Sequence, residues 1–158
     1  MSIGRTMTAV LTVTASLLFG RVIRARTDRE NKLLSAIIAD ISTVEKQIEV
    51  QKRPIAEIVE GLSAQSVFGD YWEGILHEME TGLSFEEAAA KRKPPEICTE
   101  ADNEITARGL GTDTRELRSL IGGLEKIRDE RIKQSSEKGR ITGMLSVFAG
   151  LSIALLII

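Results

Sequence analysis

Apolar residues in the middle of the chain recur every three or four positions, which is the spacing of one face of an α-helix. The first such face covers Leu33–Ile48, and the last covers Leu117–Ile132. Shorter faces begin near Pro54 and near Phe68. No stretch alternates apolar and polar residues as a β-strand does, with enrichment in β-branched residues. The pattern therefore predicts an all-α fold, in which a bundle of about six helices is joined by short loops.

Residues that end and start helices divide the first half of this region. Pro54 suits the first turn of a helix, where its missing N–H is no loss. Gly82 suits the position just after the helix that begins near Phe68. Ser84 and Glu87 have the spacing of a capping box, in which each side chain accepts a backbone N–H of the other residue. We therefore predict separate helices on the two sides of Gly82.

The second half is divided by Pro94-Pro95 and by the Gly-Leu-Gly segment at 109–111. We predict a helix over Glu96–Arg108, which the glycines end. Asp113, with Glu116 three residues later, then starts the last helix. The Gly-Leu-Gly segment lacks the third glycine, the lysine and the preceding strand of a phosphate-binding loop. A helix end followed by a helix start accounts for it.

The last 18 residues, Ile141–Ile158, contain no charged side chain. As a helix, this segment would be roughly 27 Å long, close to the thickness of the hydrocarbon core of a bilayer. A buried core helix is the alternative, but this segment is apolar on all sides and leaves no polar face. We predict a C-terminal transmembrane helix over residues 141–158.

The N-terminal segment, residues 1–26, contains an uncharged run of 15 residues, Thr6–Gly20. The run is short for a membrane span, but flanking arginines can extend their side chains toward the headgroups. A cleaved signal peptide is the alternative. No small-residue cleavage site precedes the arginine cluster after the run, and arginines there would hinder export. These features favour an uncleaved transmembrane helix.

Basic residues gather on the inner side of both predicted spans. These topology-setting residues are Arg21, Arg24, Arg26, Lys138 and Arg140. By the positive-inside rule, they place a domain over residues 27–140 in the cytoplasm and both chain ends on the other side of the membrane. The expected localisation is thus the cell membrane, with two spans and a cytoplasmic domain.

Charge is unevenly distributed although the whole chain has a net charge of only −2. The domain over residues 27–140 carries 17 basic and 23 acidic side chains, a net charge of −6, while residues 1–26 carry four arginines and no acid. An acidic domain does not attract phosphate backbones, and aromatic residues form only 4% of the chain. Composition therefore argues against nucleic-acid binding.

The chain has one cysteine, Cys98, and one histidine, His77. This composition excludes an intramolecular disulfide framework, thiolate zinc clusters and sites with paired histidines. His77 falls in an amphipathic helix, where a boundary histidine is the simpler explanation, and Cys98 is expected to pack against the core. We predict no catalytic residue, no cofactor and no metal, and hence a protein that is not an enzyme.

Charged pairs and triplets have simple explanations as well. Glu86 and Glu87 stand in the first turn of a predicted helix, where the helix dipole favours acids. Glu78 and Glu80 fit a solvated helix face. The triplet at 91–93, Lys-Arg-Lys, fits a helix C-terminus, although an anionic lipid or an acidic partner is the alternative.

Three short motifs follow one another in a fixed order. Residues 54–58 (Pro-Ile-Ala-Glu-Ile) open a predicted helix, residues 82–88 (Gly-Leu-Ser-Phe-Glu-Glu-Ala) contain the capping box, and residues 110–113 form a Leu-Gly-Thr-Asp turn. In order, spacing and total length, the chain resembles the stage III sporulation protein AB family of endospore-forming bacteria. The resemblance covers nearly the whole chain and extends to residues 143–150, which are similar to the start of the family's last span.

The resemblance implies a mother-cell protein in the membrane around the forespore, as part of the channel that links the two cells during sporulation. The family's domain is similar to the cytoplasmic domain of the inner-membrane platform protein of type II secretion and type IV pilus machines. The implied partners are a cytosolic secretion-type ATPase, the other membrane proteins of the channel and the lipid bilayer; homo-oligomers also fit. We expect partner binding at the Leu-Gly-Thr-Asp turn, through Gly111, Asp113 and Glu116. The family usually has a glutamine shortly after the aspartate of this turn, and this chain has Glu116 and Leu117 there instead.

Two other classes of function are compatible with the same sequence. In a membrane-anchored helical adaptor unrelated to secretion, the apolar face over Leu33–Ile48 would be partly exposed for a partner helix. A membrane-bound hydrolase or sensor would need His77 or a carboxylate pair for its chemistry.

Overall fold

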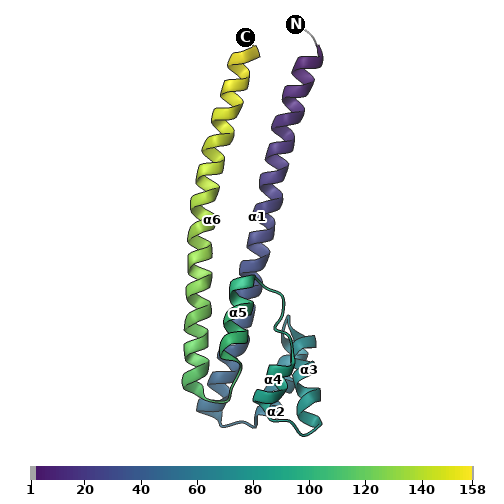
Figure 1. Cartoon of the computed structure of the whole chain (residues 1–158), viewed down its shortest axis with the longest axis vertical. Coiled ribbons are helices and arrows are strands. Elements are labelled where there is room, and N and C mark those ends of the chain that lie inside the picture. Colours follow the sequence, from purple (N-terminus) through teal and green to yellow (C-terminus); the bar gives the residue numbers. More distant parts are fainter. Residues whose placement is uncertain (1–2, 158) are drawn as a thin grey trace. The chain divides into compact units, whose positions relative to one another are not determined.

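The described part of the chain is entirely helical. The computed structural model describes the backbone of residues 3–157 and the side chains of residues 14, 21–22, 25–137, 141 and 152. Six α-helices and one π-helical turn occur in this part, and no strand does, which confirms the predicted all-α class (Figure 1). The elements are α1 (Ile3–Lys46), the π-helical turn η1 (Gln47–Gln51), α2 (Ile55–Gln65), α3 (Gly69–Glu80), α4 (Phe85–Lys91), α5 (Thr99–Arg108) and α6 (Thr114–Ile157).

The chain divides into two compact units. One unit covers Glu30–Glu130, which includes the helices α2 to α5 together with one end each of α1 and α6. The other unit combines the two ends of the chain, up to Arg29 and from Arg131 onward. We call the unit Glu30–Glu130 the central domain.

The backbone is helical near both chain ends, from Ile3 in α1 and up to Ile157 in α6. The predicted spans at 1–26 and 141–158 fall mostly outside the residues whose side chains are described, and so do the side chains of Arg24, Lys138 and Arg140. Arg21 and Arg26 are exposed. Within the described residues, no helix contains a stretch that is both long and apolar enough to cross a membrane.

The core of the central domain is one cluster of apolar side chains drawn from all its helices. Along α1 the side chains of Leu34, Ile37, Ile41 and Val44 are at most 1% exposed. The predicted face of α1 is therefore covered by the chain itself, whereas the adaptor hypothesis expects it to be partly exposed. On α6 the predicted face ends early, because Ile132 lies beyond the central domain and is 49% exposed.

The carboxylate of Asp40 joins α1 to the connection between α2 and α3. Asp40 Oδ2 accepts a hydrogen bond from the indole nitrogen of the fully buried Trp72, at 2.8 Å, and another from the hydroxyl of Ser66. Ser66 Oγ in turn accepts the N–H of Phe68 at 2.9 Å. The largest side chain of the core is thus fixed by an acceptor that comes from a different helix.

A second long-range pair joins α1 to α6. Arg118 Nε of α6 lies 2.8 Å from Glu45 Oε1 of α1, and its guanidinium also contacts Glu49 in the π-helical turn. The pKa of Glu49 lies below its usual value because it accepts this hydrogen bond from Arg118. Glu45 is the buried charged residue among the described side chains, and Arg118 supplies its counter-charge.

Most of the predicted helix ends agree with the structure. Ser84 Oγ accepts the N–H of Glu87, and the carboxylate of Glu87 accepts the N–H of Ser84, which confirms the capping box. Gly82 has a φ of +98° just after α3, as a helix-ending glycine does. Pro54 is the N-cap of α2 and not a first-turn residue, because its ψ of 135° is extended.

The predicted helix over Glu96–Arg108 begins three residues too early. Its observed start is Thr99, since Cys98 is extended and acts as the N-cap. The cause is Asp102, whose carboxylate accepts the N–H of Ile97 at 3.2 Å and so holds the preceding residues outside the helix. Glu96, which was expected to be helical, forms an exposed ion pair with Lys93 at 2.6 Å.

Two adjacent glycines in α6 provide a matched test of how α5 packs against α6. A methyl group at Gly122 would meet no atom, whereas one at Gly123 would collide with Glu104 Oε1 of α5. We expect Gly122→Ala to raise the free energy of unfolding by about 0.5–1 kcal/mol, because alanine favours the helix. Gly123→Ala is expected to lower it, because Glu104 must leave its 2.6 Å ion pair with Arg108. Urea unfolding followed by the fluorescence of Trp72, the single tryptophan, measures both; equal effects of the two variants would contradict this packing.

The Asp40 contact predicts a graded loss of stability. Asp40→Ala should lower the free energy of unfolding by about 1.5–3 kcal/mol, because the buried indole N–H loses its charged acceptor. Asp40→Asn should lose less, because its amide oxygen still accepts one hydrogen bond. Ser35→Ala, which removes only an exposed hydroxyl on the same helix, is the control and should change stability by less than about 0.5 kcal/mol. An Asp40→Ala variant as stable as the control would show that the contact contributes nothing.

Candidate functional site

The predicted partner-binding turn connects α5 to α6. It begins at Gly109, whose φ of +72° ends α5, and the N–H of Gly109 donates to the carbonyl of Ile105 at 2.8 Å. The next side chain, Leu110, is buried in the core. Because Leu110 holds the turn to the domain, the following residues are presented at the surface in one defined conformation.

A glutamate of α4 holds the middle of the turn. Glu86 Oε1 accepts the backbone N–H of Thr112 at 3.0 Å and its hydroxyl at 2.7 Å. The hydrogen bond from the Thr112 hydroxyl is the main reason why the pKa of Glu86 lies below its usual value. Glu86 was expected to be a first-turn acid of its helix, which it is, but its principal contact is this long-range one.

The three predicted site residues have different local roles. Asp113 accepts the N–H of Arg115 at 2.8 Å and thereby caps α6, as its position predicts. Gly111 is half-buried, and a methyl group on it would lie 3.2 Å from Glu116 Oε2. Asp113 and Glu116 are exposed. The structure therefore brings Gly111 and Glu116 together beside the cap and leaves two carboxylates facing solvent.

The Gly-Leu-Gly segment has the geometry of a helix end and not of a phosphate loop. Leu110 points into the core, Gly111 is followed by the cap residue Asp113, and no strand precedes the segment in the described part of the chain. Glu86 and Glu116 lie against it, and their carboxylates would repel a phosphate. The interpretation as a helix end followed by a helix start agrees with the structure.

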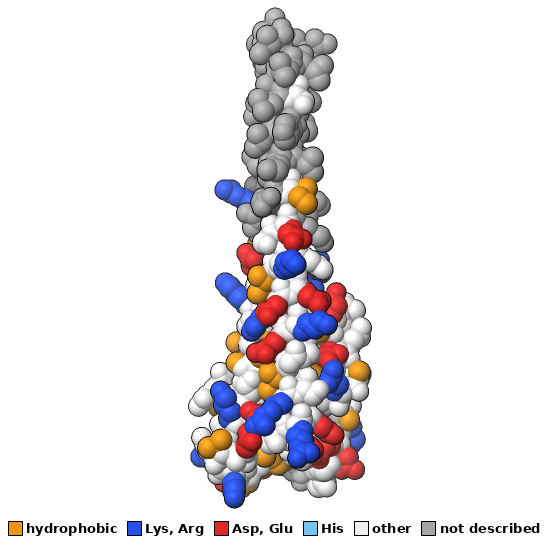
Figure 2. Space-filling view, turned by 90° about the vertical axis from the view of Figure 1, so that its left-hand side faces the viewer, with side chains coloured by type: hydrophobic (Ala, Val, Ile, Leu, Met, Phe, Trp, Pro, Cys, Tyr) orange, Lys and Arg blue, Asp and Glu red, His pale blue; other side chains and the backbone are white. Residues whose placement is uncertain are grey.

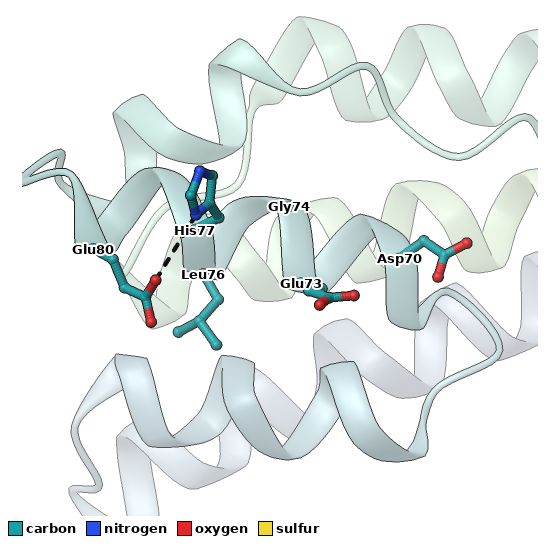
Figure 3. A pocket seen from close by; sticks show the side chains of 6 residues that line it. All are labelled: Asp70, Glu73, Gly74, Leu76, His77 and Glu80. Atoms are coloured by element: carbon teal, nitrogen blue, oxygen red, sulfur yellow. Dashed lines mark ion pairs between the residues drawn. The ribbon is translucent and has the colours of Figure 1, made fainter.

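A second surface feature, which the sequence analysis did not single out, lies along α3. A shallow pocket of about 430 Å³ is lined by one helix face, as Figure 3 shows. The lining residues are Asp70, Glu73, Gly74, Leu76, His77 and Glu80. The three acids and His77 together recur at three- and four-residue intervals, and this spacing was the available signal. His77 is exposed, with Nδ1 at 3.8 Å from Glu80 Oε2, and it makes only this weak contact.

The other charged motifs are engaged in ion pairs between helices. Glu78 of α3 accepts from Lys91 Nζ at 3.2 Å and lies 3.6 Å from Arg92 Nη2. Glu78 and Glu80 therefore do not form a carboxylate pair, and Glu78 is not part of a solvated face as expected. Two of the three bases in the Lys-Arg-Lys triplet serve this contact, and Lys93 pairs with Glu96.

The single cysteine lies at the start of α5, where it is the N-cap residue. Cys98 is half-buried and packs against the core, as expected. Within the described residues, no group of three or more His, Cys, Asp or Glu side chains is arranged to hold a metal ion.

The fold defines a class of protein, namely a small all-α domain that includes one end each of two 44-residue helices, α1 and α6. The turn between α5 and α6 is held by Glu86 and presents exposed acidic side chains. The chain belongs to the stage III sporulation protein AB family, whose model matches residues 5–158. No curated protein and no solved structure matches the chain.

The Thr112–Glu86 contact predicts a stability difference that depends on pH. Because the folded pKa of Glu86 is lowered, its contribution is fully present above the ordinary glutamate value of 4.5 and is lost as the pH falls through the folded pKa. Thr112→Val should therefore lower the free energy of unfolding by about 0.5–1 kcal/mol at pH 7 and by less at pH 3. Thr106→Val, which removes a hydroxyl bound to a backbone carbonyl at 2.7 Å, is the control, with no pH dependence expected. A loss in Thr112→Val that is the same at both pH values would contradict the assignment.

Proposed function

We propose that this chain is a non-enzymatic membrane platform subunit of the mother cell–forespore channel complex required for endospore formation, and that it docks a cytosolic secretion-type ATPase. The observation that carries the proposal is the family match over residues 5–158, which assigns the chain a role in sporulation. The finer role rests on the arrangement of the chain and on the turn between α5 and α6.

Membrane anchoring is the first part of the proposal. The uncharged runs Thr6–Gly20 and Ile141–Ile158 cross the membrane around the forespore, and the domain between them lies in the mother-cell cytoplasm. The helical backbone over both runs supports this, because only a helix or a closed barrel satisfies its backbone groups within lipid. The basic residues that flank the runs support the orientation.

ATPase docking at the turn is the second part. Leu110 and the Thr112–Glu86 hydrogen bonds fix the backbone of the turn, so the turn would lose little conformational entropy when a partner binds it. Asp113 and Glu116 offer exposed carboxylates to basic side chains of the partner. In this account the ATPase supplies the chemistry, and His77, exposed beside one glutamate, has no catalytic role.

Variants of the turn separate its binding role from its structural one. Asparagine caps a helix as well as aspartate does, so Asp113→Asn removes the charge and keeps the cap. Asp113→Lys removes both. We expect Asp113→Asn with Glu116→Gln to lower the affinity of the detergent-solubilised chain for the purified ATPase several-fold, with helicity unchanged, since each rim charge contributes modestly. Gly111→Arg should abolish binding by placing a long side chain beside Glu116.

Glu60→Gln on α2 is the matched control, because Glu60 is also exposed and belongs to a helix that does not adjoin the turn in the sequence. Binding is measured by titration of the fluorescently labelled chain with the ATPase, and helicity by circular dichroism. If the charge-removing pair binds the ATPase as tightly as Glu60→Gln does, the turn is not the docking site. If only Asp113→Lys fails, with reduced helicity, the turn is structural.

A further inference from the structure

The two compact units carry opposite net charges. The central domain, Glu30–Glu130, contains 12 basic and 21 acidic side chains, a net charge of −9. The unit formed by the two chain ends contains nine basic and two acidic side chains, a net charge of +7. The chain's modest total of −2 hides this segregation. An anionic surface would attract one unit and repel the other.

The basic side chains that follow residue 52 in the central domain differ in their partners from two arginines of α1. Between residues 53 and 128, every basic side chain except Arg115 lies in an ion pair with an acid. On the face seen in Figure 2, acidic and basic side chains are accordingly interspersed over the described part. In contrast, Arg21 and Arg29 of α1 are exposed and make no ion pair or hydrogen bond with their side chains among the described residues.

Arg21 and Arg29 lie in the same stretch of α1, next to the uncharged run. They are eight residues apart on one continuous helix, so they point in directions that differ by only about 80° and lie roughly 12 Å apart along its axis. Arg21 directly follows the uncharged run Thr6–Gly20. Because an arginine side chain can extend toward the interface, both guanidinium groups can reach the headgroup layer when that run lies in the bilayer.

We propose that Arg21 and Arg29 bind the phosphate groups of anionic lipids at the membrane surface. This inference rests on the proposed membrane anchoring and adds the lipid class that the anchor recognises. Guanidinium binds phosphate through two parallel N–H donors, and basic residues next to a span are attracted to an anionic leaflet. The net charge of −9 on the central domain acts in the opposite direction and keeps the domain away from the same leaflet.

The test uses the full-length chain reconstituted in phosphatidylcholine nanodiscs that contain spin-labelled phosphatidylglycerol or spin-labelled phosphatidylcholine. Electron paramagnetic resonance gives the relative association constant of each lipid with the chain. We expect the wild-type chain to prefer phosphatidylglycerol, and the preference to fall about fivefold for each arginine replaced in Arg21→Gln and Arg29→Gln. Salt at 0.5 M should reduce it, because the contacts are at the surface.

Lys46→Gln is the control, because Lys46 is also an exposed base of α1 but belongs to the central domain. The preference of this variant for phosphatidylglycerol should equal that of the wild-type chain. A chain that inserts and shows no preference, or one whose Lys46→Gln variant loses as much as Arg21→Gln, would overturn the lipid assignment and leave the anchoring intact. Displacement of the labelled lipid by millimolar inorganic phosphate would also overturn it, in favour of a site for free anions. A folded chain that stays outside the nanodiscs would overturn the anchoring itself.

Discussion

The central domain depends on one partly buried hydrogen bond between helices, from the Trp72 indole to the Asp40 carboxylate. Trp72 is the largest side chain in the core and is completely covered, so its N–H requires an acceptor that the protein supplies. Asp40 meets this requirement and at the same time accepts from Ser66, which sets the turn between α2 and α3. Through these hydrogen bonds Asp40 joins the α2–α3 hairpin to α1, beside the apolar core that the helices share. The ion pair between Glu45 and Arg118 joins α1 to α6 in the same way.

The turn between α5 and α6 depends on the same kind of long-range contact. Glu86 lies in the first turn of α4 and binds Thr112, so the start of one helix fixes the connection between two others. This arrangement gives the turn a defined backbone while its acids face solvent. A surface with a defined backbone suits the proposed binding of a partner protein. Family membership over almost the whole chain makes sporulation the setting in which such binding has to be explained.

Features encoded within a few residues could be predicted from the sequence. The apolar period located the helices, and the capping box at Ser84 and the caps at Gly82 and Asp113 located several of their ends. These signals are local, because each involves partners within four residues along the chain.

The contacts that set the tertiary structure left no such signal. Asp40 and Trp72 are 32 residues apart, and Glu45 and Arg118 are 73 apart. Each of these acids had an adequate local explanation as a polar residue on a helix. The late start of α5 also left no signal in the sequence. It results from the hydrogen bond that Asp102 accepts from the preceding Ile97 N–H, whereas no residue at the predicted start forbids a helix. For the candidate site, the sequence located the turn but not the glutamate that holds it.

The most direct test of the account is to identify what the protein contacts in the cell. The tagged full-length chain is crosslinked in sporulating cells, and the captured proteins are identified by mass spectrometry, with the Gly111→Arg variant as the matched sample. The account predicts that the wild-type chain captures a secretion-type ATPase together with other membrane proteins of the channel, and that the variant captures the membrane proteins without the ATPase. Membrane insertion without capture of either class by the wild-type chain would contradict the platform function.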